Sequence, residues 1–227
     1  MPAKKGPRQR RRPDAPSLSR EDWLAAAHAA VVEGGFDNLR VLVIAKALGV
    51  TRGSFYWHFA DHAELQAEVL ARWHARQLAA CAEIEPLSSP DPRLDLEHVL
   101  DVALSHAGED LEHMRFELAL RGLGRRDAAV AQLLAEVDAL RLGLFERKFR
   151  RLLGKGAAAT ELASLFYLAI VGAHQALSRP TNPPQLKERL QRLISLYLVR
   201  RQGPPAEPES APRLAKKRPA PRSAGRS

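Results

Sequence analysis

Apolar residues recur at spacings of three and four along most of this 227-residue chain, which is the periodicity of amphipathic helices. Strand signals are almost absent, since no Asn-Gly or Asp-Gly turn joins two alternating runs. Hydrophobic residues make up 45% of the chain, which is enough to bury a substantial core. We therefore expect an all-α protein, with an N-terminal three-helix domain followed by a larger helical domain.

Polar and glycine residues mark the ends of the first expected helix. Ser19, followed three residues later by Asp22, has the form of a capping box with Asp in place of the preferred Glu or Gln. Gly34 and Gly35 end the same helix, because glycine adopts the left-handed conformation of a helix C-terminus without steric cost. The sequence therefore predicts a helix that starts after Ser19 and stops at this glycine pair.

Two more helices follow in close succession. The second is expected after a cap at Asp37 or Asn38, and Gly49 ends it. Thr51 is a favourable N-cap for the third, so only Gly49 and Val50 separate the two helices. A glycine-containing turn of this length predicts a helix-turn-helix over about residues 40–59.

The later helices are expected to be longer. One should run from Asp61 to about Ile84, where Glu85-Pro86 interrupts the pattern. Apolar stripes predict five more, over about 91–107, 109–122, 126–153, 158–178 and 184–201. The expected division of the chain is a basic tail over 1–16, an N-terminal domain over 17–77, a second helical domain over 78–202 and a basic tail over 203–227.

The net charge of +9 is concentrated in the two tails. Residues 1–12 carry six basic side chains and no acidic one, and residues 203–227 carry six basic and two acidic ones. These two segments together carry a net charge of +10, one unit more than the whole chain, so residues 13–202 carry a net charge of −1. Such tails are expected to be disordered and to raise the affinity for any polyanion, whether DNA, RNA or an anionic membrane.

The cellular compartment is constrained by cysteine usage and hydropathy. Cys81 is the only cysteine, so no intramolecular disulfide can form, and a reducing compartment is the simplest interpretation. No apolar segment follows the N-terminal charges as a signal peptide requires, and no run of about 18 uninterrupted apolar residues predicts a membrane span. We expect a cytoplasmic protein.

The run from Arg52 to Phe59 has the most specific chemistry in the chain. At about 100° per residue, Phe55 and Phe59 share one face of a helix and should pack on the preceding helix. Arg52, Tyr56 and Trp57 share another face, where an arginine can bind guanine or phosphate and the aromatic side chains can contact the DNA backbone or a thymine methyl. Local spacing alone leaves open that Tyr56 and Trp57 are core aromatics.

Residues Ser17–Arg72 resemble the DNA-binding domain of the TetR family of transcription regulators. The resemblance is carried by a first helix closed by Gly34-Gly35-Phe36 and by the run Gly49-Val50-Thr51-Arg52-Gly53-Ser54-Phe55-Tyr56-Trp57-His58-Phe59. It implies a helix-turn-helix at about Arg40–Phe59. It also implies a C-terminal helical domain that forms a homodimer and often holds a ligand pocket.

The resemblance and the chemistry of the run indicate which residues contact double-stranded DNA. These are Arg40, Thr51, Arg52, Gly53, Ser54, Tyr56, Trp57, His58 and His62. Family members usually carry at His62 a lysine that meets a phosphate. A histidine there would act as a weaker, pH-dependent donor.

Apolar residues of the C-terminal domain are candidates for a ligand cavity and a dimer interface. A cavity for a small apolar or amphipathic ligand could be lined by Trp73, Leu104, Met114, Phe116, Phe145, Phe166 and Tyr167, with core packing as the simpler interpretation of each. The last two helices have wide apolar faces, which predict a two-fold, four-helix dimer interface. Its residues are expected to be Phe166, Ile170, His174, Leu190, Ile194 and Tyr197.

No phosphate loop, nucleophile motif or metal-ligand spacing is recognisable, so we expect no enzyme, no metal site and no cofactor. Two functions of different classes stay open. The first is a sequence-specific regulator, a repressor that a small ligand releases from a palindromic operator. The alternative is a helical binding protein or non-specific DNA-coating protein whose affinity comes from its basic tails.

Deleting residues 1–12 tests what the N-terminal tail contributes. Since six basic side chains are removed, binding to operator and to random DNA should weaken alike, and the dependence of the binding constant on salt should become shallower. The measurement is a salt titration of both affinities for the full-length and truncated chains. An unchanged salt slope after truncation would contradict the expected role of the tail.

Overall fold

The computed structural model describes residues 18–109, 111–179, 181–183 and 185–202, and these residues contain helices and no strand. The helices are α1 (Arg20–Gly34), α2 (Val41–Ala47), α3 (Arg52–Phe55), α4 (His62–Ile84), α5 (Pro92–Glu109), α6 (Leu111–Gly124), α7 (Ala128–Leu153), α8 (Ala157–Leu177) and α9 (Leu186–Ile194). A 3-10 turn, Phe36–Asn38, precedes α2, and a π-helical turn, Ser195–Arg200, continues α9. The all-α prediction is confirmed. The predicted tails 1–16 and 203–227 lie outside the described residues.

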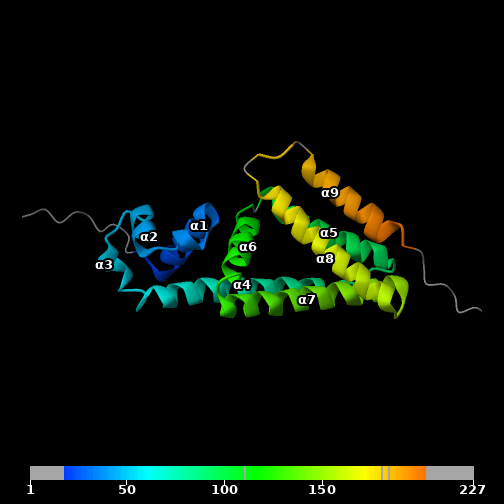
Figure 1. Cartoon of the computed structure of the whole chain (residues 1–227), viewed down its shortest axis with the longest axis horizontal. Coiled ribbons are helices and arrows are strands. Elements are labelled where there is room, and N and C mark those ends of the chain that lie inside the picture. The colour runs from blue at the N-terminus through cyan, green and yellow to red at the C-terminus, as the bar shows by residue number, and fades with distance from the viewer. Residues whose placement is uncertain (1–17, 110, 180, 184, 203–227) are drawn as a thin grey trace, which may run out of the picture.

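The helices form an elongated molecule built along two long helices. Figure 1 shows α4 and α7 side by side, with α1, α2 and α3 gathered at one end and α5, α8 and α9 at the other. Helix α6 lies across the middle and packs against α1 on one side and α7 on the other. One helix, α4, therefore connects the helix-turn-helix end directly to the C-terminal helices, and it runs unbroken through the predicted domain boundary at residue 77.

The sequence signals at the helix ends are present as predicted. Ser19 and Asp22 form the reciprocal capping box of α1, and the side chain of Asp61 accepts a hydrogen bond from the Glu64 backbone at the start of α4. The turn between α2 and α3 contains Gly49 with φ of 68°, a conformation that residues with a side chain adopt only at a steric cost. Thr51 takes the predicted N-cap position of α3, but its side chain makes no capping hydrogen bond, so within the helix-turn-helix the local signal that the structure uses is Gly49.

Two boundaries differ from the prediction. Helix α2 begins at Val41 rather than directly after Asp37 or Asn38, because the 3-10 turn takes up residues 36–38. Helix α3 is only one turn long, and Tyr56, Trp57 and His58 follow it in turns. The expected alignment of Arg52–Phe59 on one continuous helix was therefore wrong beyond Phe55, although Phe59 still folds back to bury its ring.

The core is formed by two clusters that meet on α6 and α7. The N-terminal cluster includes Trp23, Phe55 and Phe59, and it continues into Phe116 and Leu120 of α6. The C-terminal cluster surrounds the aromatic residues of α7 and α8 together with α5. Because α6 contributes to both clusters, the helix-turn-helix end is packed onto the C-terminal helices rather than tethered to them.

Helix α8 has the length and apolar composition of a membrane-spanning helix, the one such helix in the described part of the chain. Its inward face packs on α7 and includes Phe166, Tyr167 and Ile170. Its outward face exposes Leu165 and Leu168, which are 52% and 62% accessible. The apolar composition is therefore explained by one face in the core and a second apolar face that stays accessible within the described part of the chain.

Candidate nucleic-acid interface and ligand cavity

The turn at the end of α3 exposes large aromatic side chains. Trp57 is 87% accessible and Tyr56 is 53% accessible, whereas Phe55 and Phe59 are 0% and 2% accessible. The rings of Phe55 and Phe59 stack at 5.3 Å. The alternative that Tyr56 and Trp57 are core aromatics is therefore excluded, because the neighbouring phenylalanines take the core positions.

The exposed face is held in place by contacts beneath it. The Trp23 ring of α1 packs edge-on against Phe55 at 5.4 Å. Arg20, also of α1, lies 4.5 Å from the centre of the Phe59 ring and donates a hydrogen bond to the backbone carbonyl of His58 at 3.3 Å. The short helix thus depends on α1 for its position, and α1 in turn is packed on α6.

The polar residues predicted to contact DNA surround these aromatics. Arg52 is exposed, and its guanidinium donates a hydrogen bond to the Tyr56 hydroxyl at 3.2 Å. Thr51 and Gly53 are exposed, and the Ser54 hydroxyl donates to the Thr51 carbonyl. The side chains of Arg52 and Tyr56 therefore form one unit on the surface of the helix-turn-helix.

Two predicted contacts have partners within the protein. The Nε of Arg40 donates to the Asp37 carbonyl at 2.7 Å, although the arginine side chain remains exposed. The ring of His62 is hydrogen-bonded to the Leu39 carbonyl, just before α2. His62 therefore links the start of α4 to the start of α2, a role that the sequence did not suggest.

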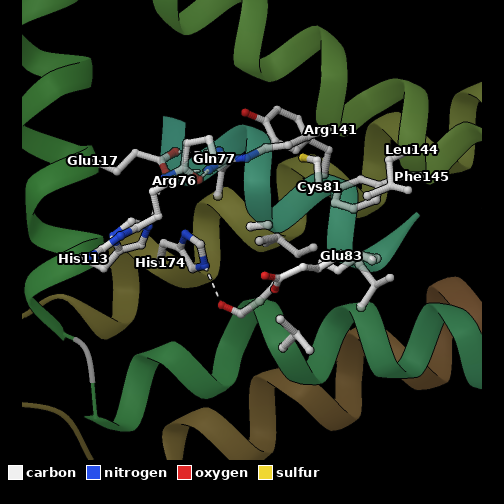
Figure 2. A pocket seen from close by; sticks show the side chains of 18 of the residues that line it. Arg76, Gln77, Cys81, Glu83, His113, Glu117, Arg141, Leu144, Phe145 and His174 are labelled. Carbon is white, nitrogen blue, oxygen red and sulfur yellow. Dashed lines mark hydrogen bonds and ion pairs between the residues drawn. The ribbon is translucent and has the colours of Figure 1, made fainter. Parts of the chain in front are cut away.

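A cavity of about 430 Å³ lies among α4, α5, α6, α7 and α8. Figure 2 shows its polar end, where His113, His174, Arg76 and Gln77 come together near Glu117. The opposite end is lined by apolar side chains of α7 and by Cys81 of α4. A cavity of this size, with an apolar wall and a few convergent polar groups, has the character of a small-molecule site.

Glu117 is the centre of a buried ion-pair network along one wall of the cavity. Its side chain is 6% accessible and accepts hydrogen bonds from Arg121 at 2.8 Å and from Arg141 at 2.9 Å. Burial tends to raise the pKa of Glu117, but hydrogen bonds and charges of the two guanidinium groups outweigh it and lower the pKa to about 2. The carboxylate is therefore charged at neutral pH, and it joins α6 to α7.

The network extends from Glu117 to two more helices. Arg121 is also paired with Asp138 at 2.8 Å and donates to the Tyr167 hydroxyl of α8 at 2.8 Å. Burial and a hydrogen bond to Asp138 raise the pKa of Tyr167 to about 12. Arg141 donates to the side-chain carbonyl of Gln77 on α4 at 2.7 Å. The two arginines and two carboxylates balance in charge.

The residues predicted to bind a ligand fall into two groups. Met114, Phe145 and Tyr167 line the cavity. Trp73, Leu104, Phe116 and Phe166 are 4%, 0%, 1% and 0% accessible and do not line it, because they fill the core, as the simpler interpretation allowed. Phe116 points away from the cavity and stacks on His28 of α1 at 4.8 Å.

The predicted dimer residues are only partly at the surface. Phe166 and Ile170 are 0% and 4% accessible, and His174 lines the cavity, so these three lie on the inward face of α8 and the prediction was wrong for them. On α9 and the π-helical turn, Ile194 is buried, Leu190 is partly buried and Tyr197 is 50% accessible. The exposed large apolar residues of α8 are instead Leu165 and Leu168.

Sequence reasoning missed the polar lining of the cavity, which includes Gln77, His113, Glu117 and Arg141. A signal was present in the pattern: Glu117 lies at three-residue spacing between the apolar positions Met114 and Leu120, and Arg141 interrupts the apolar stripe of α7. A charged residue on a core-facing stripe predicts a buried partner. Within the described residues, no group of three or more His, Cys, Asp or Glu side chains is arranged to hold a metal ion.

Residues 24–69 match the sequence profile of bacterial regulatory proteins of the TetR family. This range extends from α1 into α4 and contains the helix-turn-helix with its exposed aromatic turn. The resemblance inferred from the sequence is confirmed for this domain. A comparison with curated protein sequences finds no match.

Solved structures extend the likeness to the C-terminal helices. A transcriptional regulator from Rhodococcus sp. Rha1 superposes with a TM-score of 0.67 at 20% identity, covering 84% of this chain and 100% of its own. A protein from Saccharomonospora viridis in complex with choline gives 0.66 at 18% identity, covering 80% and 96%. A TetR transcription regulator from Haloarcula marismortui gives 0.63 at 17% identity, covering 79% and 95%. At these identities the likeness establishes the fold.

The substitution Glu117→Gln tests the buried network. Because the pKa of Glu117 is lowered from 4.5 to about 2, its charge contributes stability that is present above pH 4.5 and is lost as the pH falls toward 2. The variant should be less stable than the parent by roughly 3 kcal/mol at pH 7, and the difference should shrink at pH 3. The measurement is urea denaturation at both pH values.

Glu136→Gln is the matched control, since Glu136 is an exposed glutamate of α7. It should change stability by less than about 0.5 kcal/mol at either pH. If the deficit of the Glu117 variant were the same at pH 7 and pH 3, the ionised carboxylate would not be the source of the stability.

Proposed function

Because this chain carries the N-terminal domain of the TetR family, we propose that it is a sequence-specific transcription regulator, a repressor that a small ligand releases from a palindromic operator. The observation that carries the proposal is the exposed unit of Arg52, Tyr56 and Trp57 at the end of α3. An 87% accessible tryptophan beside a tyrosine–arginine pair is costly to leave in water and is suited to the sugars, phosphates and base edges of DNA.

We expect the DNA contacts in residues 17–77 and regulation and dimerisation in residues 78–202, except that Arg76 and Gln77, at the end of the first range, also line the cavity. We place the protein in the cytoplasm, where it would meet its operator. The cavity beside Glu117 is the proposed effector site, and the similar protein from Saccharomonospora viridis, solved with choline, supports a ligand in this fold. Of the ligand contacts predicted from the sequence, we retain the three that line the cavity, Met114, Phe145 and Tyr167.

The proposed homodimer uses the outward face of α8 together with α9 and its π-helical turn. Leu165 and Leu168 of α8 are 52% and 62% accessible, and Leu193, Leu196 and Tyr197 are 39%, 38% and 50% accessible. Pairing two copies across this face would cover the apolar surface in a two-fold, four-helix arrangement. Two recognition helices related by such an axis would match a palindromic operator.

The alternative function is a helical binding protein or non-specific DNA-coating protein that acts through its basic tails. It requires nothing of Arg52 or Tyr56, because tail charge binds DNA of any sequence. The exposed aromatic unit favours the regulator, since a coating protein has no need of a fixed aromatic surface. The two functions therefore differ in what a substitution at Tyr56 does.

Arg52→Ala and Tyr56→Ala should each abolish a footprint of the protein on its own upstream DNA. Loss of one specific contact should weaken operator binding by about 1–3 kcal/mol while affinity for random DNA changes little. Arg150→Ala is the control, since Arg150 is an exposed arginine of α7 whose partner is Glu146. A footprint that survives both substitutions would favour the coating protein.

Leu168→Glu should convert the proposed dimer to a monomer at micromolar concentration. The change places a charge at the most exposed large apolar side chain of α8, where it would be buried without a partner in the dimer. Leu140→Glu, at a 44% accessible leucine of α7, is the matched control and should leave the dimer intact. Sedimentation equilibrium measures both, and a parent chain that is already a monomer would contradict the proposal.

A further inference from the structure

The charges at the polar end of the cavity are almost all neutralised by the protein itself. Arg141 uses its guanidinium on Glu117 and on the Gln77 carbonyl. The amide nitrogen of Gln77 lies 3.2 Å from His113 Nε2, and since Arg141 fixes the orientation of the amide, Gln77 donates and the histidine accepts. This wall therefore offers an arriving ligand shape and hydrogen bonds rather than net charge.

His174 adds no positive charge. Its Nε2 lies 3.0 Å from the Ala103 carbonyl, which can only accept, so Nε2 carries the proton and donates. Burial lowers the pKa of His174, and the ring is neutral at pH 7 with an acceptor lone pair on Nδ1. Figure 2 shows this ring beside His113 at the polar end.

Arg76 is the cation of this end that no described carboxylate pairs with. It lines the cavity from α4, and its one polar contact in the described residues is with the ring nitrogen Nδ1 of His113 at 3.5 Å. Because Nε2 of His113 accepts from Gln77, Nδ1 carries the ring proton and cannot accept a hydrogen bond from Arg76. A guanidinium presents five N–H donors in a planar fork suited to a carboxylate. A ligand anion would thus find an unpaired, correctly shaped partner here.

The face of α4 beyond Arg76 defines the rest of the ligand. Ala79 and Ala80, one turn further along α4, line the cavity with small side chains, and Leu144 and Phe145 of α7 supply an apolar wall. Glu83 lines the cavity two turns from Arg76, at a distance of about 10 Å along the helix axis. A second anionic group at that end would meet a carboxylate of like charge.

We propose that the cavity binds an amphipathic monocarboxylate, with the carboxylate on Arg76 and an unbranched or aromatic apolar body over Ala79 and Ala80 toward Phe145. The volume of about 430 Å³ sets its size at the lower end of ordinary ligands. The inference rests on the proposed function, because this ligand is the effector that the regulator would sense. A dicarboxylate would bind less well, because its second carboxylate would lie near that of Glu83. A cation would find no unpaired carboxylate at the polar end, because Glu117 and Asp138 are paired with arginines.

The test is isothermal titration calorimetry of the full-length chain with decanoate, decanedioate and decyltrimethylammonium, each below its micelle concentration. Decanoate should bind at least tenfold more tightly than the other two probes. Arg76→Gln should weaken decanoate at least tenfold, and Arg76→Lys, which keeps the charge, should recover part of the affinity. Arg150→Gln, the loss of an exposed arginine outside the cavity, should leave the affinity within twofold.

Three outcomes would overturn the inference. These are no decanoate binding to the parent chain, decanoate binding that Arg76→Gln leaves unchanged, or tighter binding of decyltrimethylammonium, which would assign the cavity to cations held by Glu83. A DNA footprint on the same preparations separates this result from the proposed function. A retained footprint without decanoate binding rejects only the ligand class, whereas decanoate binding without any footprint rejects the regulator and leaves the carboxylate site standing.

Discussion

The buried carboxylate of Glu117 is the interaction around which the C-terminal helices are arranged. Through Arg121 and Arg141 it joins α6 to α7, and the same two arginines reach Tyr167 of α8 and Gln77 of α4. Removing charges from water is costly, so such a network is favourable only when every member is paired in one geometry. It therefore specifies how four helices meet, and the cavity is the space that this geometry leaves beside it.

Helix α6 gives this network a physical connection to the helix-turn-helix. One face carries Met114 and Glu117 at the cavity, while Phe116, on the opposite side, stacks on His28 of α1 at 4.8 Å. Helix α1 in turn holds the exposed turn of α3 through Trp23. A ligand that shifts α6 would have to move α1 as well, because a packed interior has little free space to absorb the displacement.

The sequence predicted the helices better than the side-chain directions. Caps such as Ser19 with Asp22, and the turn glycine Gly49, act within one or two turns of chain, so their consequences were visible locally. The face of α8 was mispredicted because that helix is apolar on two sides, and periodicity cannot say which side meets the core. Phe166 lies inside and Leu168 outside only because α7 packs against the former.

By itself the sequence determined the all-α class and the position of the helix-turn-helix, since each depends on spacing along one stretch of chain. Tertiary structure decided that Tyr56 and Trp57 are exposed, that His62 bonds to the Leu39 carbonyl and that Glu117 is paired with two arginines. The His62–Leu39 and Arg141–Glu117 contacts join residues 23 and 24 positions apart, whereas Arg121 lies four positions from Glu117 on α6 and is held there by partners on other helices. A charged residue on an apolar stripe predicts a buried partner of opposite charge, but only the packing of the helices identifies that partner.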